Sequence, residues 1–121
     1  MTARKGWDID LRDGKMAEGT IARLLGDSRI EVKPDEICRR TGKLFVEFEC
    51  RGNKSGLSVT TAAYWAFQYD DCKWLIVQTS TVRRLATRAW KEKLIANGGD
   101  EGASRGVLIP IKWFVETELR I

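Results

Sequence analysis

Alternating apolar and polar positions predict three strands in the first half of the chain. Apolar side chains take every second position in residues 7–11, 29–35 and 44–51, with mostly charged side chains between them. Successive side chains of a strand point to opposite faces, so this period indicates strands with one face toward a core. Thr41-Gly42-Lys43 is typical of a turn. The two longer strands are therefore expected to pair as an antiparallel hairpin, with Glu31 opposite Glu47.

Other segments have apolar residues three or four positions apart, which predicts helices, or continuous apolar runs, which predict buried strands. Residues 15–25 have one apolar stripe followed by Gly26, which is typical of a helix and its end. The run of alanine and aromatic residues at 60–69 also predicts a helix. Residues 73–79 form a continuous apolar run of strand length, which favours a buried parallel strand.

The last third of the chain predicts a basic helix and a final strand. Ser80 or Thr81 is expected to cap the helix, and Asn97-Gly98-Gly99 is expected to end it. Residues 107–115 predict a strand that is interrupted at Pro110. Strands that alternate with helices indicate an α/β domain, and the hairpin adds an antiparallel part. At 121 residues we expect one domain with a mixed central sheet flanked by helices.

Composition excludes several classes of protein and of chemistry. Hydrophobic residues make up 43% and charged residues 31%, which is typical of a globular protein. No apolar run approaches the ~20 residues of a membrane helix, so we expect no membrane partner and a cytoplasmic location. Three cysteines without a CxxC pair favour neither a disulfide framework nor a zinc site. The chain has no histidine, which excludes catalysis that depends on a histidine base or ligand.

Positive charge is concentrated in one segment. The net charge of the chain is +4, and residues 81–96 alone carry five basic residues and one acid, 5 − 1 = +4. Such a segment is either an ordinary solvated helix face or a surface that follows phosphates. For a phosphate-binding role the candidate side chains are Arg51, Lys54, Arg83, Arg84 and Arg88.

Carboxylates supply the candidate chemistry. Glu47 and Glu49 occupy alternate positions of one strand, about 6.5–7 Å apart on the same face. Two acids this close repel each other, so solvent, a basic neighbour or a divalent cation should compensate them. Acids from other elements could join them, because Mg²⁺ and Mn²⁺ prefer oxygen ligands. Solvated acids on a half-exposed strand remain the alternative.

The order of these acids resembles the PD-(D/E)XK nuclease superfamily, and most closely small phage nucleases and Holliday junction resolvases. The resemblance covers residues 15–96: Glu18 matches the acid of the first helix, Asp27 the acid that opens the hairpin, and Glu47-Phe48-Glu49 the (D/E)XK triplet. It implies a restriction-endonuclease-like αβββαβ core. It also implies a metal-dependent DNA endonuclease, active on branched DNA as a homodimer, with Mg²⁺ or Mn²⁺ on Glu18, Asp27 and Glu47.

The chain departs from the superfamily at two positions. No proline precedes Asp27, and the triplet ends in Glu49 where lysine is usual. Lys33 or Glu49 would then position the attacking water, and Asp35 competes with Asp27 as the second acid. Two further hypotheses about the function remain. The chain is a nucleic-acid-binding protein with a nuclease-like fold and no activity, or it is a structural or interaction domain such as a viral accessory protein.

Overall fold

The structure is a computed structural model that describes residues 19, 23, 26, 29–34 and 36–119. The strand expected at 7–11 and the acids Glu18, Asp27 and Asp35 lie outside the described residues, as does most of the helix expected at 15–25.

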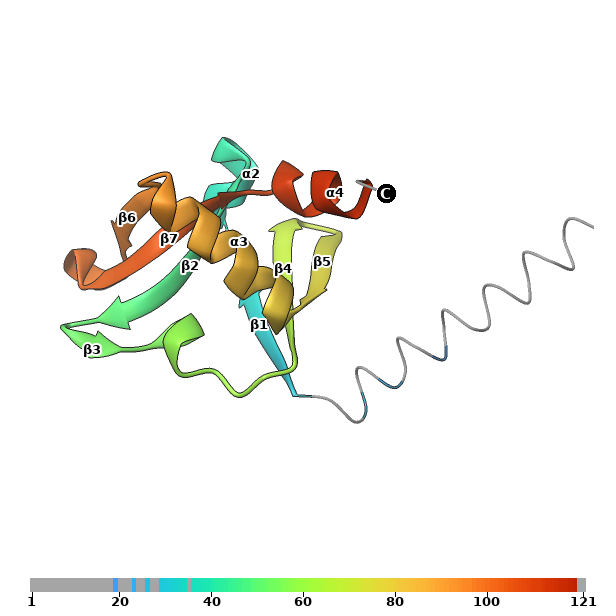
Figure 1. The fold of residues 1–121 in the computed structure, drawn as a ribbon, viewed down its shortest axis with the longest axis horizontal. Helices are drawn as coiled ribbons and strands as arrows, with labels where there is room; N and C mark the ends of the chain where they lie inside the picture. The colour runs from blue at the N-terminus through green and yellow to red at the C-terminus, as the bar shows by residue number, and fades with distance from the viewer. Residues whose placement is uncertain (1–18, 20–22, 24–25, 27–28, 35, 120–121) are drawn as a thin grey trace, which may run out of the picture.

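The described residues form a mixed α/β fold with two sheets (Figure 1). The three-stranded sheet has the order β1-β4-β5 and consists of β1 (Ile30–Pro34), β4 (Tyr64–Asp70) and β5 (Lys73–Gln78). The four-stranded sheet has the order β3-β2-β7-β6 and consists of β3 (Asn53–Lys54), β2 (Lys43–Cys50), β7 (Ser104–Pro110) and β6 (Ile95–Gly98). The α-helices are α2 (Glu36–Thr41), α3 (Thr79–Lys91) and α4 (Lys112–Leu119), and two 3-10 turns are η1 (Gly56–Ser58) and η2 (Asp100–Gly102). The expectation of an α/β fold is therefore confirmed, but the expectation of one mixed central sheet is wrong: the described strands form two sheets, and only the three-stranded sheet has both parallel and antiparallel pairs.

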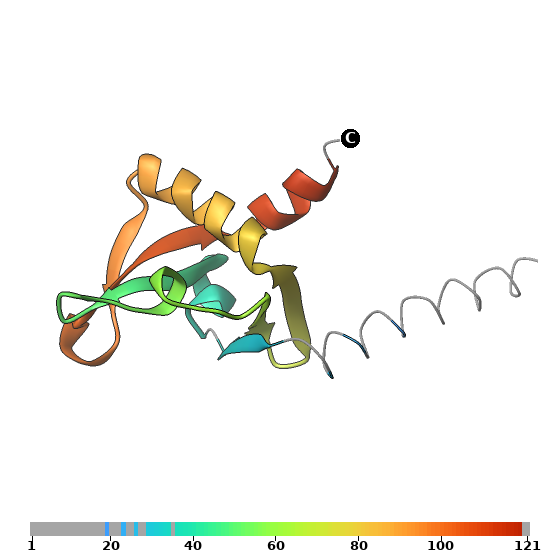
Figure 2. The ribbon, with the colours of Figure 1, turned by 60° about the horizontal axis from the view of Figure 1, so that its bottom comes forward.

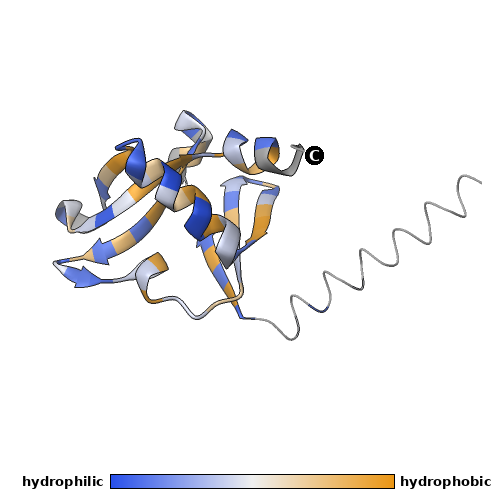
Figure 3. Ribbon diagram, viewed as in Figure 1, coloured by the Kyte–Doolittle hydropathy of each residue, from blue (hydrophilic) through white to orange (hydrophobic). Residues whose placement is uncertain are grey.

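One hydrophobic core joins the two sheets beneath α3. Val82, Leu85 and Ala89 of α3 are buried together with Val46 of β2 and Phe67 of β4. Figure 2 shows α3 lying across one side of the strands, and Figure 3 shows apolar positions alternating with polar ones along β2 and α3. The inward side of α3 is thus fixed by packing, and its outward side is left for solvent or for a ligand.

The hairpin prediction is wrong. β1 pairs in parallel with β4, which sets Glu31 opposite Trp65 rather than Glu47. Residues 36–41, expected as a loop, form α2, whose Cys38 is buried in the core. Gly42 follows the helix at φ 71°, and its N–H donates to the Cys38 carbonyl at 2.8 Å. The glycine that indicated a hairpin turn therefore ends a helix, a position that also favours glycine because φ is positive.

The helix predicted at 60–69 is also wrong, because its second half is β4. Aromatic residues favour strands, and Trp65 and Phe67 face the core from this one. Residues 73–78 form the predicted strand, β5, but the prediction that it is buried and parallel is wrong: it pairs antiparallel with β4 at an edge of its sheet, and Trp74 and Ile76 are exposed. A continuous apolar run thus occurs here in a half-exposed strand.

The basic helix is confirmed as α3, although its predicted ends are wrong. Its N-cap is Gln78, without a side-chain hydrogen bond, and it ends at Lys91. Lys93 follows at φ 61°, and its N–H donates to the Trp90 carbonyl while the N–H of Leu94 donates to the Ala89 carbonyl. These two bonds are those of a Schellman motif, with lysine in the position where glycine is usual.

The end of the chain also differs from the prediction. Asn97 and Gly98, expected to end the basic helix, belong to β6. The final strand expected at 107–115 is confirmed only in part, because β7 ends at Pro110. Residues 113–115 are helical and belong to α4, where Trp113 and Phe114 close the core.

Candidate nucleic-acid interface

The outward side of α3 carries a stripe of basic side chains. Arg84, Arg88 and Lys91 are exposed and follow one another at helical spacing, four and three residues apart. At a rise of about 1.5 Å per residue they extend over about 10 Å of the helix. Together with Thr87 and Glu92 they border a shallow hollow. α3 contains no aspartate or glutamate. We call Arg84, Arg88 and Lys91 the basic stripe.

Neighbouring side chains hold one member of the stripe in place. The Arg88 guanidinium lies 3.7 Å from the centroid of the Trp113 ring, and its Nε donates to Glu92 Oε2 at 2.9 Å. A planar guanidinium stacked on an indole loses little further conformational freedom when it binds a phosphate. Arg84 makes no ion pair or hydrogen bond through its side chain to any residue that the structure describes.

The Arg83 side chain, unlike those of Arg84 and Arg88, contacts the segment around η1. Its guanidinium donates to the backbone carbonyls of Leu57 at 3.0 Å and Thr60 at 3.3 Å. These bonds hold the segment around η1 against α3 and satisfy carbonyls that lie outside any sheet. The structure therefore gives Arg83 a part in the fold, and its contact with phosphate stays a prediction.

Arg51 and Lys54 lie in and beside the tight turn between β2 and β3. Arg51 and Gly52 have φ of 52° and 82°, which is the pattern of a type I′ hairpin turn. Lys54 is opposite Glu49 in the strand register, and both basic side chains are exposed. The structure thus places them on a hairpin of the four-stranded sheet, on a different element from the basic stripe.

The two acids of the predicted triplet have different surroundings. The register between β2 and β7 shifts by one residue between Glu47 and Glu49, as in a β-bulge, so strict alternation is interrupted at Phe48. Glu49 Oε2 lies 3.6 Å from Arg105 Nη1 of β7. Glu47 is half-buried, and its carboxylate makes no ion pair or hydrogen bond to the described part of the chain.

Lys33 is not brought beside Glu47 by a hairpin. It belongs to β1 of the three-stranded sheet, and its Nζ lies 5.7 Å from the centroid of the Trp65 ring. Glu47 belongs to β2 of the other sheet. The geometric reason for assigning Lys33 a role in positioning water is therefore lost, and its role stays a prediction.

The residues needed for a metal centre are only partly described. Among the side chains that the structure describes, no three acidic or cysteine side chains lie close enough together to hold a metal ion. Glu47 is described, whereas Glu18 and Asp27 lie outside the described residues. Gly56 packs closely on the strand that carries Glu47: a Cβ there would lie 2.3 Å from the Glu47 carbonyl oxygen.

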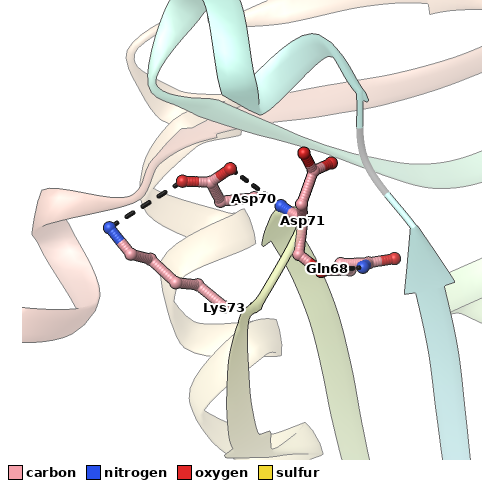
Figure 4. A network of polar contacts seen from close by, with 4 residues as sticks. All are labelled: Gln68, Asp70, Asp71 and Lys73. Atoms are coloured by element: carbon pink, nitrogen blue, oxygen red, sulfur yellow. Dashed lines mark hydrogen bonds and ion pairs between the residues drawn. The ribbon is translucent and has the colours of Figure 1, made fainter.

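Asp70 and Asp71 form a second acidic region, whose contacts stabilise the turn between β4 and β5. Asp70 Oδ2 lies 3.8 Å from Lys73 Nζ, and Asp70 Oδ1 accepts a hydrogen bond from the N–H of Asp71 (Figure 4). Gln68 Nε2 donates to the Asp71 carbonyl at 3.1 Å. These contacts close the turn between β4 and β5.

A cluster formed by Phe48, Trp90 and Arg105 is not predicted by the sequence analysis. The Phe48 and Trp90 rings are 5.4 Å apart and nearly perpendicular, and the Arg105 guanidinium lies 5.6 Å and 5.9 Å from their centroids. One signal was available: Trp90 is a large aromatic residue on the polar side of a basic helix. Its partners come from β2 and β7, far away in the sequence, so only the fold reveals them.

No helix within the described residues has the length and apolar character that a membrane span requires. Comparison of the chain with protein-family models, curated proteins and solved structures finds no match.

Proposed function

We propose that the chain binds nucleic acid through the outward side of α3. The observation that supports this most strongly is the basic stripe, whose three positive charges are paired, within the described residues, only with Glu92, the residue that follows α3. An ordinary solvated helix face usually mixes both signs of charge, because pairs at i and i+4 stabilise it. Lysine and arginine that neutralise phosphates provide most of the affinity of non-specific nucleic-acid binding.

An exposed aromatic residue beside the stripe favours nucleic acid over other anionic partners. Trp90 is 47% exposed and lies on α3 between Arg88 and Lys91 in the sequence. Proteins that bind single strands combine a basic surface with aromatic rings on which bases stack. Phosphate contacts and an aromatic ring on one helix thus fit a polynucleotide, whereas a smaller anion would use the charges alone.

Two double variants test this function. Arg84→Ala/Lys91→Ala removes two charges from the stripe, and Arg40→Ala/Lys73→Ala removes two from exposed positions on α2 and β5. A hydrogen bond to a charged group contributes about 1.5–3 kcal/mol, and about 1.4 kcal/mol corresponds to a tenfold change in affinity. The stripe variant should therefore bind fluorescein-labelled DNA at least about tenfold more weakly, and the control variant should bind like the parent. Equal losses in the two variants would contradict the proposal.

Metal-dependent hydrolysis of DNA is the second proposed function, and the position of Glu47 supports it. A half-buried carboxylate loses hydration, and a nearby cation would compensate this loss. Glu47 has no such partner among the described residues, which fits a ligand for Mg²⁺ or Mn²⁺ together with Glu18 and Asp27. Such an ion, when bound, supplies charge stabilisation at the phosphate and an activated water. This function includes the finer expectations from the resemblance: the restriction-endonuclease-like core, the branched DNA substrate and the homodimer.

Cleavage of branched and linear DNA with Mg²⁺, Mn²⁺ and a chelator tests the second function. Glu47→Gln should abolish cleavage and remove any thermal stabilisation by the metal, because binding to the folded state stabilises it by mass action. Glu101→Gln, at an exposed position of η2, is the matched control. Cleavage by Glu47→Gln at the parental rate would exclude Glu47 from the site. Glu49→Gln and Lys33→Met then distinguish which side chain positions the water.

A further inference from the structure

An apolar groove of about 380 Å³ lies between α3 and the four-stranded sheet. Val46 and Phe48 of β2, Leu57 of η1, and Arg83 and Trp90 of α3 contribute to its wall. Its volume falls within the range of about 300–1,000 Å³ that is typical of small-molecule sites. The groove is therefore large enough for a planar ring system, and its wall is mostly apolar.

Aromatic and cationic groups meet at this groove. The interruption of the β2–β7 register at Phe48 coincides with the contact between Phe48 and Trp90, whose rings make an angle of 85°. In a perpendicular pair, at least one face of the Trp90 ring is left uncovered by Phe48. The Arg105 guanidinium lies near both rings and is held by Glu49. Trp90 thus contributes an aromatic ring to the wall of the groove, and Arg105, paired with Glu49, lies beside that ring.

The groove adjoins the basic stripe at Thr87. Thr87 borders both the groove and the hollow formed by Arg84, Arg88 and Lys91. A strand whose phosphates lie on the stripe would therefore have its bases within reach of Trp90. Bases of a closed duplex are stacked on one another and cannot enter such a groove, whereas unpaired bases can.

We propose that this groove binds an unpaired nucleobase of the strand held by the basic stripe, so that the preferred ligand is single-stranded nucleic acid. The proposal rests on the proposed nucleic-acid-binding function and adds the form of its ligand. It explains why a large apolar ring is exposed beside the charges of α3. It also gives a function to Phe48, which lines the groove and packs against the Trp90 ring, and to Arg105, which lies beside both rings.

Binding of fluorescein-labelled oligothymidine and of a duplex of equal length tests this proposal. The parent should bind oligothymidine more tightly than the duplex. Trp90→Ala should weaken oligothymidine binding by about 5- to 150-fold, the range for loss of one stacked base, and should change duplex binding little. Trp90→Phe keeps an aromatic ring and should stay within about threefold of the parent. Trp74→Ala is the matched control, because Trp74 is 45% exposed on β5, and it should bind like the parent.

The outcomes separate this proposal from the function on which it rests. If the parent binds both DNAs and Trp90→Ala, folded by its melting curve, binds oligothymidine as the parent does, the nucleobase site is refuted and nucleic-acid binding stands. If Trp90→Ala unfolds, Trp90→Phe decides: loss of oligothymidine affinity to the level of the duplex would refute stacking. A parental dimer that Trp90→Ala dissociates without loss of DNA affinity would assign the groove to a second copy of the chain. Absence of binding to either DNA would refute both proposals.

Discussion

Replacement of Lys93 by glycine should stabilise the protein. Lys93 has a φ of 61° just after α3, a conformation that costs a residue with a Cβ about 1–2 kcal/mol. Glycine removes this cost, but it loses about 0.5–1 kcal/mol more conformational entropy on folding than other residues do. The free energy of unfolding should therefore rise by about 0.5–1 kcal/mol, and Tm should rise by about 2–4 °C for a domain of this size.

Lys91→Gly is the matched control for this prediction. It removes the same charge from the same end of the helix, so the loss of its interaction with the helix dipole is similar. Lys91 has helical geometry, where glycine costs up to about 1 kcal/mol. Urea unfolding and thermal melting of both variants should show Lys93→Gly to be more stable by about 1.5 kcal/mol, or about 6 °C. Equal stability of the two variants would refute the assignment of Lys93 to the left-handed position of the Schellman motif.

Two further substitutions test how the groove walls are built. Gly106→Ala should lower the free energy of unfolding by about 3 kcal/mol, because the added Cβ would lie 2.5 Å from the Val46 carbonyl oxygen. Urea unfolding measures this loss, and a loss below about 1 kcal/mol would contradict the close approach of the two strands. Arg83→Met should cost about 1 kcal/mol of stability, because the Leu57 and Thr60 carbonyls lose their donor, and it should weaken DNA binding less than Arg84→Ala does. A stable Arg83→Met variant with greatly reduced DNA affinity would instead make Arg83 a phosphate contact.

Local patterns predicted the elements that have a strong periodicity or apolar run of their own. The basic helix, the strand at 44–51 and the strand at 73–79 were all recognisable, because each has a periodicity or an apolar run of its own. The ends of α3 were not, because Gln78 caps it without a side-chain bond and Lys93 takes the place of glycine. Helix ends depend on backbone geometry that a residue type favours but does not determine.

Pairing between strands could not be read from these patterns. Period-two alternation is the same whether residues 29–35 pair with β2 or with β4, and Gly42 suits a hairpin turn as well as a helix end. Tertiary packing decides which strand residues 29–34 pair with. Because they pair with β4 and not with β2, Lys33 and Glu47 lie in different sheets. The cluster of Phe48, Trp90 and Arg105 was missed for the same reason, because three distant segments form it.

The salt dependence of duplex DNA binding tests the central claim most directly. Each phosphate neutralised by the protein adds about 0.9 to the negative slope of log K against log salt concentration. If α3 binds the phosphates, the parent should show a clear negative slope, and Arg84→Ala/Lys91→Ala should reduce its size by about 1.8. The same slope in the parent and in this variant would contradict an interface on α3.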